Sequence, residues 1–165
     1  MKYYSELALL GVFNYDDAKK IINNTNPMKV LSSYIKKGYI KKIKHNLYTC
    51  VDLVTYTDLS DKFLIATKIN EDSFIIGHTA FEFYGFYNQV FYNCQVAALK
   101  KFQEFEYDNI NYEYFSSNNL TQVVTLRGVK VTTIERAIID SIDLIDKVMD
   151  LEELLKCIDV IPKIK

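Results

Sequence analysis

The spacing of apolar and polar positions in the first fifty residues predicts three short helices followed by a β-hairpin. Gly11 follows the first apolar run as a C-cap, and Asn14 stands where a second helix would take its N-cap. Asn26 and Pro27 are the N-cap and first residue expected of a third helix. Helices are therefore predicted over residues 2–10, 15–23 and 27–37, and strands over residues 39–43 and 47–50. This order of elements is that of a winged helix-turn-helix.

The rest of the chain predicts a different arrangement, with helices on either side of a strand-rich middle. Turn residues in 51–60 indicate a linker, and we expect a domain boundary near Asp58. Thr132, with Glu135 three residues later, is predicted to form a capping box. Helices are predicted over residues 61–70, 78–84, 133–144 and 151–160, and short strands over 73–77, 90–92, 95–98, 110–115, 123–126 and 129–131, with apolar alternation at Phe102, Phe105 and Tyr107.

Together these patterns predict an α+β protein of two domains. Residues 1–57 would form a winged helix-turn-helix DNA-binding domain, and residues 58–165 a mixed α/β domain. Charge supports this division. Residues 1–50 hold nine lysines and three acidic residues, a net charge of +6, whereas residues 51–165 hold eleven basic and eighteen acidic residues, a net charge of −7. A basic head on an acidic body indicates different partners for the two parts.

Basic residues concentrate on the third helix and the hairpin, where six lysines and no acidic residue lie between Lys29 and Lys44. One face of that helix carries lysines and serines, which suits a helix in a DNA major groove, because lysine contacts phosphates and serine reads bases weakly. The predicted DNA-binding residues are Lys29, Ser32, Ser33, Lys36 and Lys37 on the helix, Lys41, Lys42 and Lys44 on the hairpin, and His45 and Asn46 at its tip. The alternative is a protein-interaction module with a solvated lysine surface.

No catalytic, cofactor-binding or metal-binding residue is predicted. The chain lacks the nucleophile-elbow, phosphate-loop and zinc-protease motifs, and its three cysteines lie far apart, which argues against a disulfide framework and fits the cytoplasm. No apolar run approaches the roughly 18 residues that span a membrane. His78 beside Glu82 is a candidate general base, although a histidine at a helix start more often has a structural role. Arg136 and Asp140 are spaced as a helix-stabilising ion pair.

Several segments resemble the AbiEi antitoxin family, the transcriptional-regulator half of type IV bacterial toxin–antitoxin systems linked to abortive phage infection. In the head, the resemblance is carried by residues 11–18 (GVFNYDDA), 31–40 (LSSYIKKGYI) and 41–48 (KKIKHNLY). In the body, it continues in residues 61–66 (DKFLIA), 78–85 (HTAFEFYG) and 131–140 (VTTIERAIID). The resemblance covers essentially the whole chain.

This resemblance implies a function. Such antitoxins bind inverted repeats upstream of their own operon through the winged helix and repress it, and their C-terminal domain counteracts a cognate nucleotidyltransferase toxin without a stable complex. Carried over to this chain, the residues facing the groove would be Lys29, Ser32, Ser33 and Lys36, and those on the backbone Lys41, Lys42 and Lys44. We therefore predict a non-enzymatic antitoxin and autorepressor. The alternatives are a winged-helix regulator that senses a ligand or protein through its aromatic-rich body, and an enzyme using His78 and Glu82.

Overall fold

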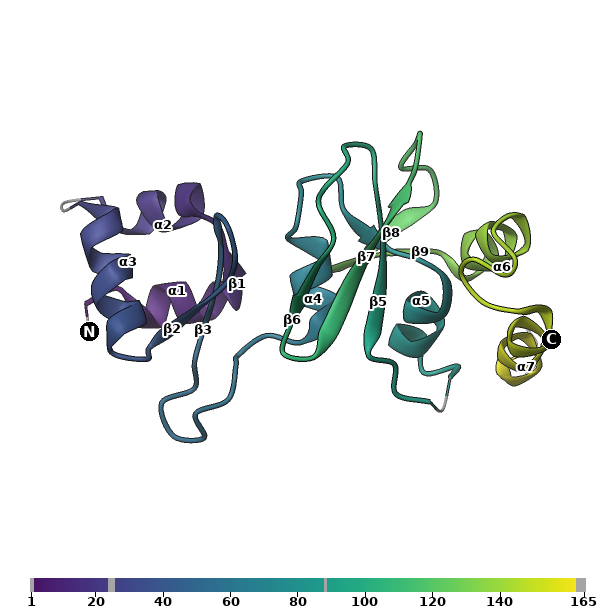
Figure 1. Cartoon of the computed structure of the whole chain (residues 1–165), viewed down its shortest axis with the longest axis horizontal. Helices are drawn as coiled ribbons and strands as arrows, with labels where there is room; N and C mark the ends of the chain where they lie inside the picture. The colour runs from purple at the N-terminus through teal and green to yellow at the C-terminus, as the bar shows by residue number, and fades with distance from the viewer. Residues whose placement is uncertain (1, 24–25, 88, 163–165) are drawn as a thin grey trace.

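The structure is a computed structural model that describes residues 2–23, 26–87 and 89–162. Within them, seven helices and two β-sheets form a mixed α+β fold, so the predicted fold class is confirmed at this level. The molecule is elongated, with α3 (Pro27–Lys36) near one end and both α6 (Ile134–Asp143) and α7 (Leu151–Val160) at the other (Figure 1). No described helix has the length and apolar character needed to cross a membrane.

The N-terminal part of the chain consists of three helices and three short strands. The elements are α1 (Tyr4–Leu10), β1 (Val12–Phe13), α2 (Tyr15–Ile21), α3, β2 (Ile40–Lys44) and β3 (Leu47–Cys50). The predicted N-caps are confirmed, because Asn14 forms a reciprocal capping box with Asp17, and Asn26 Oδ1 accepts hydrogen bonds from two N–H groups of α3. All three helices are shorter than predicted, by one or two residues at an end.

A three-stranded antiparallel sheet, in the order β1-β3-β2, packs against these helices. The β2–β3 hairpin matches the prediction to within one residue, and a β-bulge shifts its register between Lys42 and Lys44. A small core joins the helices to the sheet, and its largest fully buried side chains are Leu7, Phe13, Ile22, Leu31 and Ile40. Burial of Leu31 and Tyr34 on one side of α3 turns the opposite side of that helix to solvent.

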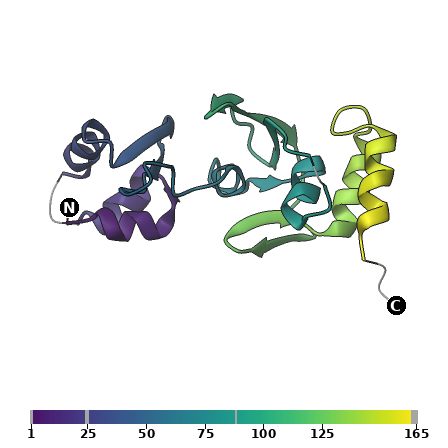
Figure 2. The same ribbon diagram turned by 90° about the horizontal axis from the view of Figure 1, so that it is seen from below.

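The residues from Asp58 onward, here called the body, contain a six-stranded mixed sheet in the order β6-β7-β5-β4-β9-β8. The first elements are α4 (Lys62–Thr67), β4 (Phe74–Ile75), α5 (Gly77–Tyr84) and β5 (Asn93–Ala98). They are followed by β6 (Phe105–Tyr107), β7 (Ile110–Ser116), β8 (Val123–Leu126), β9 (Val129–Thr132), α6 and α7. The helix α4 lies on the side of the sheet that faces the N-terminal part. On the opposite side lies α5, with α6 and α7 beyond it (Figures 1 and 2).

Several details of the body differ from the sequence prediction. The helix predicted over residues 61–70 ends at Thr67, and the strand predicted over 73–77 is only Phe74–Ile75, because Gly77 already belongs to α5. The predicted strand over residues 90–92 is wrong, because the chain there is irregular and Val90 and Tyr92 are exposed; pairing begins only at Asn93. The N-cap of α6 is Thr133 rather than Thr132, since Thr132 is the last residue of β9 and Thr133 Oγ1 accepts the hydrogen bond from Arg136 N. Glu135 therefore falls one position too early for the predicted capping box.

The stretch predicted as a linker is an ordered connection between the two parts. Val51 pairs with Asp58 in an isolated antiparallel bridge, and Leu59 N donates a hydrogen bond to Cys50 O at 2.9 Å. Two hydrophobic clusters lie on either side of it, one in the N-terminal part and a larger one in the body. Three buried residues of the N-terminal sheet belong to the larger cluster: Val12, Ile43 and Leu47. The N-terminal sheet is thus packed on both faces, against its own helices and against the body.

Candidate nucleic-acid interface

The exposed side of α3 gathers half of the residues predicted to bind DNA. Lys29, Ser32, Lys36 and Lys37 are exposed and Ser33 is half-buried, and together with Asn26 and Met28 they line one shallow hollow. None of these lining residues is acidic, and within the described part of the chain no carboxylate lies within ion-pair distance of the three lysines. We call these five residues the α3 face: Lys29, Ser32, Ser33, Lys36 and Lys37.

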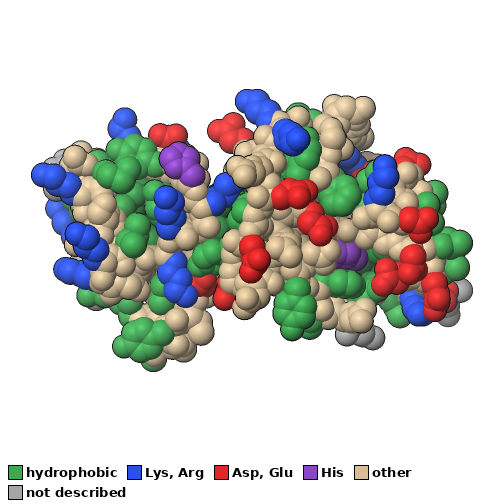
Figure 3. All heavy atoms as spheres, viewed as in Figure 1, with side chains coloured by type: hydrophobic (Ala, Val, Ile, Leu, Met, Phe, Trp, Pro, Cys, Tyr) green, Lys and Arg blue, Asp and Glu red, His purple; other side chains and the backbone are tan. Residues whose placement is uncertain are grey.

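Figure 3 shows that the two ends of the molecule differ in charge. Lys and Arg side chains gather over the end that contains α3, whereas Asp and Glu side chains spread over the body and cluster at the α6–α7 end. The net charges of +6 for residues 1–50 and −7 for residues 51–165 therefore correspond to separate surfaces. An anionic polymer such as DNA is attracted to the first surface and repelled by the second.

The hairpin lysines are arranged differently from the α3 face, because two of the three contact the body. Lys41 Nζ lies 2.7 Å from Asp58 Oδ1, and Asp58 Oδ2 accepts a hydrogen bond of 2.6 Å from Tyr107 Oη. Asp58 is thus held through both carboxylate oxygens, one paired with Lys41 and the other hydrogen-bonded by Tyr107. Burial raises the pKa of Tyr107, and its hydrogen bond to Asp58 adds to the effect.

Lys44 is held by aromatic rings. Its Nζ lies 4.7 Å from the ring centroid of Phe105 and 5.6 Å from that of Phe102, both within the range of a cation–π interaction. Burial lowers the pKa of Lys44. Lys41 and Lys44 therefore help attach the hairpin to the body, and neither side chain is free in this conformation.

The remaining hairpin residues divide between structure and solvent. Asn46 has φ +59°, and its Oδ1 accepts a hydrogen bond of 3.0 Å from Tyr15 N at the start of α2. This contact ties the hairpin tip to α2, so Asn46 has a structural role. Lys42 and His45 are exposed. Of the ten predicted residues, the structure thus gathers five on α3, leaves Lys42 and His45 exposed on the hairpin, and engages the other three within the protein.

The histidine considered as a general base lies inside the body. His78 is only 4% exposed, and its ring stacks on Phe91 with centroids 4.0 Å apart. Burial, aided by the charge of Lys62, lowers the pKa of His78 to about 4, so the imidazole is neutral near pH 7. Glu82 is paired with Lys62 at 2.7 Å between Oε2 and Nζ. His78 and Glu82 therefore do not form an open acid–base pair; His78 packs as a core residue.

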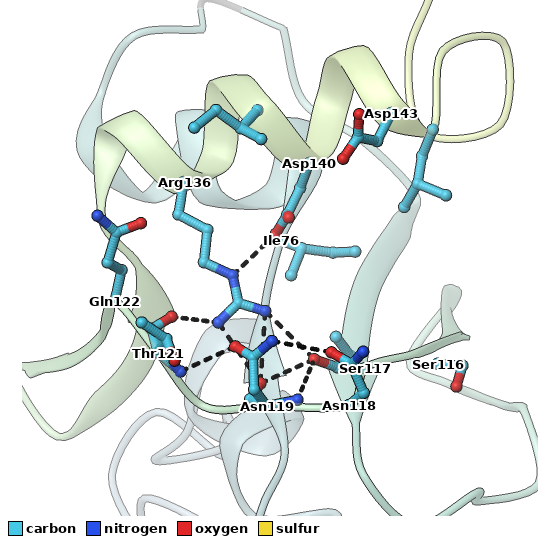
Figure 4. A pocket seen from close by; sticks show the side chains of 13 residues that line it. Ile76, Ser116, Ser117, Asn118, Asn119, Thr121, Gln122, Arg136, Asp140 and Asp143 are labelled. Carbon is cyan, nitrogen blue, oxygen red and sulfur yellow. Dashed lines mark hydrogen bonds and ion pairs between the residues drawn. The ribbon is translucent and has the colours of Figure 1, made fainter.

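A cavity of about 480 Å³ lies between α6 and the chain that follows β7, with Arg136 at its centre (Figure 4). Arg136 Nε donates to Asp140 Oδ2 at 3.2 Å, and the two terminal nitrogens donate to Ser117 Oγ and to the carbonyl oxygens of Asn119 and Thr121. All the nitrogens of the guanidinium are thereby engaged within the protein. The predicted ion pair with Asp140 is confirmed, and Arg136 acts as a clamp that ties residues 117–121 to α6.

Sequence reasoning missed the partners of the hairpin lysines and the wider role of Arg136. Asp58 was expected only as a boundary residue, and nothing in its local sequence indicates Lys41 or Tyr107, which are far away along the chain. Among the described residues, no three His, Cys, Asp or Glu side chains lie together as a metal site requires.

Comparison with known proteins does not assign the chain to a family, because no family model and no curated protein matches it. The chemistry of the α3 face is therefore the main guide to function.

Proposed function

We propose that this protein binds double-stranded DNA through its N-terminal part, folded as a winged helix-turn-helix, with α3 as the recognition helix. The order of three helices followed by a hairpin supports this assignment. Asn26 and Pro27 fix the start of α3, and buried Leu31 and Tyr34 hold its polar side outward. A helix supported in this way is rigid enough to enter a major groove.

The observation that carries the proposal is the composition of the α3 face. Lys29, Lys36 and Lys37 are free of acidic partners within the described residues and stand beside Ser32 and Ser33. Lysine ammonium groups attract phosphates over several ångströms, and the serine hydroxyls offer both donors and acceptors to base edges. The α3 face is thus suited to strong, salt-dependent binding with modest sequence discrimination.

The hairpin is expected to contribute less to DNA binding than its lysine-rich sequence suggests. Lys41 and Lys44 are engaged by Asp58 and by aromatic rings of the body, so Lys42 is the hairpin lysine available for a phosphate. We infer that the hairpin mainly fixes the orientation of the body relative to the DNA.

A regulatory role follows from DNA binding together with the resemblance to AbiEi antitoxins in residues 61–66, 78–85 and 131–140. We infer that the protein represses its own operon and that the body counteracts a cognate nucleotidyltransferase toxin without a stable complex. The body's net negative charge suits this division of labour, since it keeps the body away from phosphates.

The DNA-binding proposal is tested by gel shift on the DNA upstream of the gene, at several salt concentrations. Replacing Lys29 or Lys36 by alanine is expected to weaken binding and to reduce the slope of log K against log salt by about one for each phosphate that is no longer neutralised. Lys101→Ala is the matched control, because Lys101 is an exposed lysine of the body. Equal effects of all three substitutions would contradict an interface on α3.

The antitoxin proposal is tested separately by co-expression with a neighbouring nucleotidyltransferase gene. Growth should be rescued by the wild-type protein and also by the Lys29→Ala and Lys36→Ala variants, because the proposed activity lies in the body. Failure of the wild-type protein to rescue growth would overturn the antitoxin role and leave DNA binding unaffected.

A further inference from the structure

The connection between the two parts contains a loop, residues 52–57, whose conformation is fixed by its own hydrogen bonds. Asp52 Oδ1 accepts from Val54 N at 2.7 Å and from Thr55 N at 2.9 Å. The backbone closes the loop through Asp52 N to Thr57 O and Tyr56 N to Asp52 O, both 2.8 Å. These bonds to the carboxylate lower the pKa of Asp52, so it is charged near pH 7. The segment is a defined loop and not a flexible tether.

This loop presents two large apolar side chains to solvent. Val54 is 87% exposed and Tyr56 is 76% exposed. Tyr56 also has φ +59° and is the one aromatic residue with positive φ among the described non-glycine residues. A bulky residue in this region strains the backbone, and Asn or Gly at the same position would relieve that strain. The tip of the loop therefore presents two exposed apolar side chains and a strained backbone, neither of which stabilises the folded state.

The loop is rooted beside the C-terminal end of α3. Val51 N donates to Tyr39 O at 2.9 Å, and Tyr39 N donates to Tyr34 O on the last turns of that helix. Lys37, a residue of the α3 face, is the C-cap of the same helix. In Figure 1 the chain between β3 and α4 descends from the N-terminal part as a projection, and Figure 3 shows hydrophobic side chains on that projection with basic side chains above it.

We propose that this loop is a second DNA-contacting element, which inserts Val54 and Tyr56 into the minor groove next to the major groove occupied by α3. The inference rests on the proposed DNA-binding function. Minor-groove proteins insert one or two apolar side chains between base steps and partly unstack them. The narrow minor groove admits a thin loop, and a rigid loop loses little conformational entropy on insertion.

The size of the apolar tip favours DNA over a second copy of the chain. A specific protein interface buries about 800 Å² on each partner, drawn from some 20–30 residues. Two side chains on a projecting loop bury much less area than such an interface needs. Insertion between two base steps, in contrast, requires only one or two apolar side chains. Backbone hydrogen bonds attach the base of the loop to the segment that ends α3, so the lysines of the α3 face, Lys37 at the C-cap among them, would supply the phosphate contacts that such a wedge requires.

The decisive variant is Tyr56→Asn, because asparagine tolerates positive φ. We expect its affinity for the upstream DNA to fall about tenfold with an unchanged salt slope, since no charge is removed. Its melting temperature should equal or exceed that of the wild-type protein, because strain is relieved and the side chain is exposed. Tyr92→Asn is the matched control, an exposed tyrosine of the body that should change nothing. The fluorescence of a 2-aminopurine base, placed at the base step in the minor groove next to the α3 site, should increase when the wild-type protein binds and unstacks it. With Tyr56→Asn the fluorescence should not increase.

Three outcomes would overturn the inference. In the first, Tyr56→Asn binds DNA with the same affinity and salt dependence as the wild-type protein, and the 2-aminopurine fluorescence does not change on binding. The proposed DNA-binding function would then stand, but without this loop. Another is a concentration-dependent dimer that Tyr56→Asn abolishes, which would assign the tip to a second copy. The third is a wild-type protein that binds no duplex DNA, which would overturn the proposed function as well.

Discussion

Lys41 and Asp58 form an ion pair across the junction between the N-terminal part and the body, with Nζ and Oδ1 2.7 Å apart. Lys41 is on β2, and the Asp58 side chain, only 11% exposed, is also hydrogen-bonded by Tyr107 on β6. A lysine that the sequence predicts to bind DNA is thus part of the contact that joins the two halves. The relationship shows that the positive charge of a hairpin does not by itself identify a nucleic-acid surface.

We predict that Lys41 and Asp58 are energetically coupled. A double-mutant cycle with Lys41→Ala and Asp58→Asn, measured by urea unfolding, should give a coupling free energy of about 1 kcal/mol, at the upper end for a pair with one half-exposed partner. Lys42→Ala with Asp58→Asn serves as the control pair and should be additive. A coupling near zero for Lys41 and Asp58 would mean that the ion pair does not stabilise the junction.

Lys44 and Lys29 should respond to substitution in opposite ways. Lys44→Ala removes a cation–π contact and the packing of its stem, so the free energy of unfolding should fall by about 1 kcal/mol while the salt slope of DNA binding stays unchanged. Lys29→Ala should leave stability within about 0.5 kcal/mol and lower the salt slope by about one. Chemical denaturation and gel shifts on the same two variants measure both effects. A lower salt slope for Lys44→Ala would show that the hairpin leaves the body when DNA binds.

His78 should make stability depend on pH. Its pKa is about 4 in the folded protein and 6.5 when unfolded, so the unfolded chain binds an extra proton between these values. Stability should therefore rise with pH from 4 to 6.5 and gain on the order of 3 kcal/mol from this group. His78→Phe retains the stack on Phe91 and removes the titration, so its stability should vary less over that window. His45→Gln is the control, since His45 is exposed; identical pH profiles for the wild type and His78→Phe would refute the assignment.

Much of the local structure could be predicted from the sequence, because its causes are local. Asn14 and Asn26 accept hydrogen bonds from N–H groups within the next three residues, and the helix over residues 151–160 ends where expected. The predicted strand over 90–92 shows the limit of such reasoning. Apolar alternation was present there, but Val90 and Tyr92 are exposed, and the register of β5 with β7 starts at Asn93; Tyr92 contributes only its carbonyl oxygen, which accepts a hydrogen bond from Asn111 N.

The candidate site was predictable only in part, for a related physical reason. Helical periodicity places Lys29, Ser32 and Lys36 on one side of α3, and the structure agrees. Nothing local reveals which face of the hairpin is covered, because that depends on Phe102 and Phe105, which follow Lys44 by 58 and 61 residues. The strained backbone of Tyr56 was equally hidden, since positive φ is usually signalled by Gly or Asn.

The double-sided packing of the N-terminal sheet has a consequence for dissecting the protein. Val12, Ile43 and Leu47 are covered by the body, so a fragment ending at Thr57 would expose these three side chains to water. Such a fragment is expected to self-associate unless one of them is replaced by a polar residue. Heating the intact chain should therefore unfold the N-terminal part and the body in a single transition, so a substitution that destabilises the body should also weaken the proposed DNA binding.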